Sequence, residues 1–212
     1  MNAALFGERL LAFNLLPSLT LHPSRYAAFG APSRPVPAAC AAAWHRHWSA
    51  AILRRLNLRD RPVADADRPE LPLALLSPDR LARVARHLGA VCCAPRLRRV
   101  IAGSEVRVLA VAVGGDVLAF ARQAETGGWS RPADLDDGLT TGWADRLDQI
   151  GCAALRHIFH AAGPELGLRA ELRLADEPAV NVPDAGQIPL DLALDILERI
   201  EPTWHSSFHA TR

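Results

Sequence analysis

Residues 142–162 read GWADRLDQIGCAALRHIFHAA, and this stretch decides the fold class. Its apolar side chains recur at the period of an α-helix and fall on one face of it. They are Trp143, Leu147, Ile150, Ala154, Ile158 and Ala161. Gly163 and Pro164 follow directly and are typical of a helix end. The stretch therefore predicts a long amphipathic helix that buries one face.

Helical patterns continue on both sides of this stretch. Residues 38–58 consist mostly of strong helix formers and place Trp44 and Trp48 near one stripe. Shorter helices are predicted at 5–15, 94–102 and 188–200. Only 6% of the residues are aromatic, and the hydrophobic share is mostly Ala, Leu and Val, which favours close-packed helices over a β-sandwich. The sequence predicts an all-α, mainly helical, compact multi-helix globular domain.

Prolines and glycines predict where the helices in the middle of the chain begin and end. Residues 59–76 contain three prolines and four acidic residues, so they are predicted to be an exposed loop. Ser77, Pro78 and Asp79 combine a capping hydroxyl, a proline and an acid, which is typical of a helix start. We expect Gly89 to end this helix.

Two segments leave the choice between helix and strand open. The run VRVLAVAV at 106–113 fits a buried strand or a helix. Gly114 and Gly115, followed by DVLAFARQA, favour a pair of helices around a tight turn. Residues 165–185 leave room for a minor short β-hairpin.

The length of 212 residues and a hydrophobic content of 50% fit one domain with its own core. We interpret 1–212 as a single helical domain, with an N-terminal motif region at 1–37, a helical body at 38–200 and a C-terminal tail at 201–212. No run of 18 uncharged apolar residues is present, so no membrane-spanning helix is expected.

The first residues do not resemble a signal peptide, because Glu8 and Arg9 interrupt the apolar stretch. The four cysteines form no C-x-x-C motif, which favours reduced thiols in the cytoplasm. They are Cys40, Cys92, Cys93 and Cys152. A cytoplasmic protein is the expectation that follows.

Charge is distributed unevenly along the chain, which contains no lysine. Residues 1–100 hold 15 arginines and 6 acids, a net charge of +9, and residues 101–212 hold 9 arginines and 17 acids, a net charge of −8. Two interpretations stay open. The halves attract each other within one fold, or they meet different partners of opposite charge.

Residues capable of metal binding do not form a complete site. His157 and His160 lie one turn apart on a predicted helix, whereas His45 and His47 lie on different faces. Zinc needs three or four ligands, and no spacing supplies the others. Asp134, Asp136 and Asp137 resemble part of a calcium loop, but its terminal glutamate is missing. We expect exposed helix and loop surfaces at these positions and no bound metal or cofactor.

Nucleophilic and phosphate-binding motifs are equally incomplete. Cys92 and Cys93 have no oxyanion donor or strained turn beside them and are interpreted as small apolar fillers. Gly114-Gly115-Asp116 lacks the G-x-G-x-x-G frame, and a chain without lysine has no Walker motif. No catalytic constellation emerges, so the sequence favours an interaction protein over an enzyme.

Arginine clusters are the candidate binding residues. One cluster comprises Arg54, Arg55, Arg59 and Arg61, and another comprises Arg96, Arg98 and Arg99. They lack interleaved aromatic residues for stacking on bases, and the acidic half of the chain would repel nucleic acid. The first cluster is therefore predicted to bind a protein partner.

Two motifs resemble a known family. Residues 13–17 (FNLLP) with 21–24 (LHPS) look like the N-terminal signature of the type III secretion protein family SctK, also called YscK or PscK. A second stretch agrees: IAGSEVR at 101–107, the apolar run to 113, and GDVLAFA at 115–121. Length and motif positions extend the resemblance over the whole chain.

The resemblance implies an all-helical cytoplasmic adaptor of the injectisome sorting platform, at the cytoplasmic face of the inner membrane. Family members link the cytosolic domain of the inner-membrane ring protein SctD to the pod protein SctQ, which continues to SctL and the ATPase. The role supports assembly of the platform, protein secretion and virulence, without turnover. We interpret the N-terminal motif as structural, a helix end locked against the body of the domain.

Two other classes remain as alternatives. A small metal-dependent helical hydrolase would use His157, His160 and nearby acids. A type III export chaperone would share the helical composition, although such chaperones are usually smaller, acidic and dimeric. Net charge of +1 argues against the second.

Overall fold

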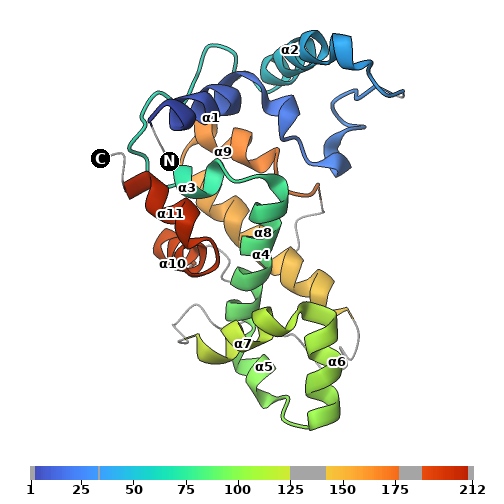
Figure 1. The fold of residues 1–212 in the computed structure, drawn as a ribbon, viewed down its shortest axis with the longest axis vertical. Coiled ribbons are helices and arrows are strands. Elements are labelled where there is room, and N and C mark those ends of the chain that lie inside the picture. Colours follow the sequence, from blue (N-terminus) through green and yellow to red (C-terminus); the bar gives the residue numbers. More distant parts are fainter. Residues whose placement is uncertain (1–2, 33, 125–141, 177–187, 210–212) are drawn as a thin grey trace. The chain divides into compact units, whose positions relative to one another are not determined.

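A computed structural model of the chain describes residues 3–32, 34–124, 142–176 and 188–209. Over these residues it is an all-α protein without strands (Figure 1). The described helices are α1 (Ala3–Leu15), η1 (Pro17–Leu19), η2 (Pro23–Arg25), α2 (Ala38–Arg55), α3 (Leu71–Ala74), α4 (Pro78–Cys92), α5 (Ala94–Arg99), α6 (Gly103–Val113), α7 (Gly115–Gln123), α8 (Trp143–Ala161), α9 (Pro164–Glu171), α10 (Leu190–Ile200) and α11 (Pro202–His209). The predicted fold class is confirmed.

The chain divides into two compact units. Unit 1 comprises 1–81, 159–176 and 201–212, and unit 2 comprises 82–158 and 177–200. Because both units draw on both halves of the sequence, the charge asymmetry shrinks. Unit 1 holds 13 arginines and 10 acids, a net charge of +3, and unit 2 holds 11 arginines and 13 acids, a net charge of −2.

Unit 1 packs α2 against the N-terminal turns and against the end of α9. Its core includes Leu21, Trp48, Ile52 and Leu172, with Trp44 partly buried beside them. The indole of Trp48 donates a hydrogen bond to the Phe29 carbonyl at 2.7 Å. The predicted tryptophan stripe of 38–58 therefore does face the core.

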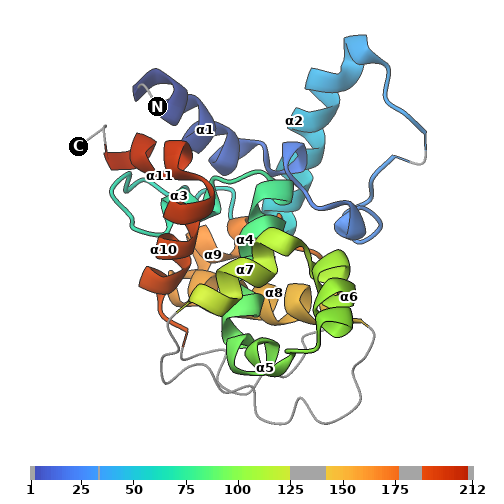
Figure 2. The same cartoon turned by 60° about the horizontal axis from the view of Figure 1, so that its bottom comes forward.

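The C-terminal region of unit 1 is a docked helix, whereas the sequence suggested only a tail. In α11 the Trp204 indole is buried and donates a hydrogen bond to the Pro72 carbonyl at 2.7 Å. The Arg9 guanidinium lies 4.6 Å from the Trp204 ring centroid, and the Phe6 and Phe208 rings meet edge to face at 5.7 Å. Helices α1 and α11 are thus neighbours (Figures 1 and 2).

The prediction of an exposed loop at 59–76 is wrong for its last third. Residues 71–76 (LPLALL) are all buried, and α3 contacts α9 and α11. Proline is compatible with the first turn of a helix, where its missing N–H has no partner to lose. The prolines here mark the start of a buried turn.

The expected helix end at Gly89 is also wrong, because α4 continues to Cys92 in unit 2. A Cβ at Gly89 would lie 2.0 Å from the Leu147 carbonyl oxygen, and one at Gly151 would lie 1.7 Å from that of Ala85. These glycines allow α4 and α8 to cross with their backbones in contact. Their role is close packing within two helices.

The segments left open between helix and strand are helical where they are described. Residues 106–113 belong to α6, and Gly114, with φ of +100°, forms the turn into α7 as predicted. Residues 164–171 form α9. Residues 177–185 of the suggested hairpin lie outside the described residues. So do residues 126–141, whose content of Gly, Asp and Thr predicts a loop.

Candidate partner-binding site

The basic cluster predicted to bind a partner lies in unit 1 where α2 ends. Arg54 and Arg55 occupy its last turn, a position that favours cations. Asn57 then adopts a left-handed conformation (φ +56°), and the Leu58 N–H donates to the Leu53 carbonyl at 2.8 Å. This is the usual way for a helix to end at asparagine.

Two of the four predicted arginines contribute to the packing of unit 1 itself. Arg55 donates a hydrogen bond to the Ala28 carbonyl, and its guanidinium lies 5.1 Å from the Phe29 ring centroid. Arg61 forms an ion pair with Glu165. The pKa of Glu165 is lowered by a hydrogen bond from its own backbone N–H and then by Arg61. Substituting either arginine would disturb intramolecular contacts.

Arg54 and Arg59 differ from this pair. Both are exposed, and neither has a hydrogen bond or ion pair to any residue that the structure describes. They are the members of the cluster that are available to an acidic partner. Partner binding by the four arginines stays a prediction, and it depends mainly on Arg54 and Arg59.

The N-terminal motif makes hydrogen bonds inside unit 1, as its structural interpretation expects. The amide of Asn14 donates to the Val63 carbonyl at 3.0 Å and accepts from the Val63 N–H at 2.8 Å. This pair ties the last turn of α1 to the segment that follows α2. The His22 side chain accepts from the Ser24 N–H, and the Ser24 hydroxyl accepts from the Asp176 N–H at 2.7 Å.

A buried arginine of α9 organises the same region. Arg169 is 2% exposed and donates to four backbone carbonyls, those of Asn14, Leu58, Arg61 and Glu165. Burial lowers the pKa of its guanidinium, and no carboxylate forms an ion pair with it among the described residues. Because a guanidinium has five donors and no acceptor, one side chain satisfies carbonyls from three segments.

A second arginine after α9 repeats this arrangement. Arg173 donates to the Leu76 carbonyl, and its guanidinium lies 5.1 Å from the Phe13 ring centroid. Burial lowers the pKa of Arg173 to about 10. Arg25, from the other side, donates to the Leu174 carbonyl at 2.9 Å and pairs with Glu171 and Asp176. No sequence pattern indicates these roles, since the partners are backbone carbonyls or, for Arg25, acids about 150 positions away.

The predicted metal-binding residues do not come together. His160 lies 3.3 Å from the Glu171 carboxylate, and within the described ranges no three His, Cys, Asp or Glu side chains form a group that fits a metal ion. Asp134, Asp136 and Asp137 fall outside those ranges.

Buried thiols and a buried hydroxyl are the other groups with reactive chemistry. Burial raises the pKa of Cys92 and of Cys93 to about 12, so both are neutral thiols at physiological pH. Ser18 Oγ lies 2.9 Å from His45 Nδ1, the distance required of a nucleophile and its base. Ser18 is only 3% exposed and also contacts Ser49 Oγ at 2.7 Å, so its hydroxyl has no access to a substrate.

Each unit has several exposed apolar side chains. In unit 1, Leu11, Leu15 and Leu19 are exposed, Leu11 to 60%. In unit 2, Ile101, Val108 and Val111 are exposed around α6, Val111 to 88%. Contiguous exposed apolar side chains commonly mark protein interaction sites. Sequence periodicity missed both surfaces because it locates apolar stripes without showing whether the chain itself covers them.

Comparisons with protein-family models, curated proteins and solved structures find no match to this chain. In the part of the chain that the structure describes, no helix is both long and apolar enough to cross a membrane. The described residues thus form an all-α protein with exposed apolar side chains on both units and an exposed basic pair, Arg54 and Arg59, on unit 1.

Proposed function

We propose that the protein is an adaptor of the type III secretion sorting platform that links the SctD cytosolic domain to SctQ. The observation that carries this proposal is that each unit has exposed side chains that no other described residue buries or pairs. An adaptor needs two such surfaces, one for each partner. The choice of partners rests on the resemblance of the two sequence motifs to the SctK family.

Unit 1 offers a basic surface. Arg54 and Arg59 have no acidic partner among the described residues, so their charges are free to attract an acidic surface. Unit 2 offers the apolar α6 surface of Ile101, Val108 and Val111. Under the proposal, one partner binds each surface, and SctL and the ATPase join through SctQ.

Binding of purified SctD cytosolic domain and SctQ to the intact chain tests the proposal. We expect Arg54→Glu with Arg59→Glu to weaken one of the two contacts by about 10-fold, since each exposed charge pair contributes up to about 1 kcal/mol. Val108→Asp with Val111→Asp should weaken the other. Arg46→Glu is a matched control, because Arg46 is exposed on α2 outside the cluster.

Failure of both folded partners to bind the parent chain would reject the adaptor role. Deleting the gene should then also leave the cytoplasmic pods intact beneath the needle complex, whereas an adaptor is required for their assembly. The alternatives predict other results. Stoichiometric zinc or iron in untagged protein would favour the hydrolase, and binding to exported substrates in place of SctD and SctQ would favour the chaperone.

A further inference from the structure

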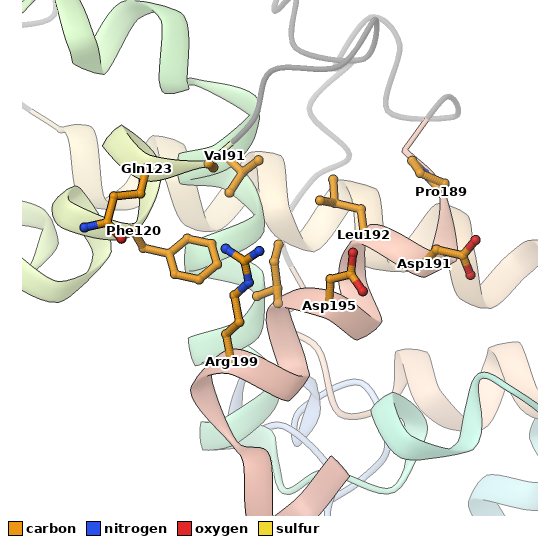
Figure 3. Close-up of a pocket in the computed structure, with 10 residues that line it drawn as sticks. Val91, Phe120, Gln123, Pro189, Asp191, Leu192, Asp195 and Arg199 are labelled. Atoms are coloured by element: carbon orange, nitrogen blue, oxygen red, sulfur yellow. The ribbon is translucent and has the colours of Figure 1, made fainter. Parts of the chain in front are cut away.

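Unit 2 contains a cavity of about 400 Å³ between α4, α7 and α10 (Figure 3). Its lining is mixed: the apolar residues are Val91, Phe120, Ala124, Pro189, Leu192 and Ile196, and the polar ones are Gln123, Asp191, Asp195 and Arg199. A cavity of this size is at the lower end of the range that small ligands occupy. It accommodates one bulky side chain of a partner with space for its flanking atoms.

The aromatic wall of the cavity is held in place. The imidazole of His87 meets the Phe120 ring edge to face, with centroids 5.2 Å apart. The Arg199 guanidinium lies 5.7 Å from the centroid of the same ring. The Phe120 ring therefore packs between His87 and Arg199 where it lines the cavity.

Two carboxylates line the cavity on α10. Asp191 and Asp195 are one helical turn apart and exposed (Figure 3). Neither has a hydrogen bond or ion pair to a described residue. The cation that lines the cavity, Arg199, is stacked on Phe120. Two carboxylates and one guanidinium give the described lining a net charge of −1. Apolar side chains beside this net negative charge are complementary to a ligand that is apolar and positively charged.

We propose that this cavity binds a helical segment of a partner protein that carries a bulky apolar residue and, one turn away, a lysine or arginine. The apolar side chain enters between Phe120, Leu192 and Ile196. The cation lies against Asp191 and Asp195. Amphipathic helices bind apolar grooves in this way, with side chains one turn apart as anchors. The inference stands on unit 2 alone and does not depend on the SctD and SctQ assignment.

An array of helical peptides tests the chemistry directly. Each peptide has about three turns of an alanine-glutamine background, one Leu, Phe or Ala, and one Lys, Gln or Glu a turn later. We expect the intact protein to bind Leu-Lys and Phe-Lys peptides, to bind Ala-Lys peptides less, and not to bind Leu-Glu peptides. Absence of binding to every peptide, or equal binding of the Lys and Glu series, would overturn the proposal.

Variants of the cavity locate the binding. Asp191→Asn with Asp195→Asn should weaken the Leu-Lys peptide about 5- to 20-fold, because two exposed charge pairs are lost. Glu198→Gln is the matched control, since Glu198 is an exposed acid on α10 outside the cavity lining. Leu192→Ala should weaken binding with the charge unchanged. Equal affinities of the parent and both cavity variants, with unchanged circular dichroism, would place the peptide elsewhere and reject the site.

Discussion

The two units are stabilised by different kinds of contact. In unit 1, long polar side chains reach the backbone of irregular segments: Arg169 satisfies four carbonyls, and Asn14 pairs with both backbone groups of Val63. In unit 2, α4 and α8 meet backbone to backbone at Gly89 and Gly151. The packing of unit 1 thus uses side-chain hydrogen bonds to the backbone, whereas that of unit 2 uses glycines, whose missing side chains let two helices touch.

The difference follows from the lengths of the helices. Long helices satisfy most of their own backbone groups, so α8 needs only a smooth surface for close approach. The connections of unit 1, such as 56–70, leave carbonyl groups that must find donors when they are buried. Arginine supplies several donors from one position, which explains why buried arginines gather around α9.

The largest effect is expected from filling the glycine crossing. Gly89→Ala with Gly151→Ala should lower the free energy of unfolding by about 2–6 kcal/mol, because each added methyl group overlaps a backbone carbonyl and overpacking costs about 1–3 kcal/mol per site. Urea denaturation measures this. Gly7→Ala is the control, since Gly7 lies within α1 and a Cβ there has no atom within 4 Å. It should stabilise the protein by about 0.5–1 kcal/mol. A tolerated double change would contradict the close crossing.

The next effect concerns the arginine that joins three segments of unit 1. Arg169→Met keeps much of the apolar volume but leaves buried carbonyls without donors, and we expect a loss of about 2–4 kcal/mol in unfolding free energy. Hydrogen exchange should increase first at 58–61 and near Asn14. Arg46→Met, an exposed arginine of α2, should change stability by less than about 0.5 kcal/mol. Similar losses in both variants would mean that Arg169 contributes no specific anchoring.

A smaller effect isolates the motif asparagine. Asn14→Leu removes two hydrogen bonds with Val63 at nearly constant volume and should cost about 1–3 kcal/mol. Its neighbour provides the comparison, because Leu15→Asn places the same amide on an exposed side chain and should be nearly neutral. Thermal unfolding of the two variants distinguishes a structural motif from a binding motif. Wild-type stability with loss of partner binding in Asn14→Leu would reverse our interpretation.

The smallest effect is a pH dependence of stability in unit 2, where His87 is a buried titratable group. Burial lowers the pKa of His87, so the unfolded chain binds its proton at a higher pH than the folded chain. Stability should therefore fall as pH decreases through about 6.5 toward the folded pKa. His87→Gln should reduce this pH dependence in urea titrations, whereas His157→Gln, at an exposed position, should not. Identical slopes in the parent and His87→Gln would exclude the contribution.

The sequence predicted the helices well where one periodic pattern dominates, as in α2, α8 and α10. It misassigned 71–76 because prolines in a buried turn look like those of a loop. The helix end at Gly89 was predicted wrongly because the sequence does not distinguish a glycine that ends a helix from one that lets two helices touch. The distinction depends on a residue 58 positions away, Leu147, which no local pattern contains.

The binding surface was predicted in part. Local charge located Arg54, Arg55, Arg59 and Arg61, but only three-dimensional contacts separate Arg55 and Arg61, which pack internally, from the other two. The net charges of +9 and −8 on the two halves of the sequence likewise do not describe the folded units, because each unit contains residues from both halves. Charge along a sequence predicts a surface only when neighbouring residues fold into the same body.

The docking of α11 beside α1 makes unit 1 a good subject for circular permutation. Since Phe6 meets Phe208 and Arg9 covers Trp204, a short glycine-serine linker can join the helices without crossing the core. New termini can open in the exposed stretch at 34–35, ahead of α2. We expect the rearranged gene to encode the same fold, with α1 and α11 becoming one continuous hairpin.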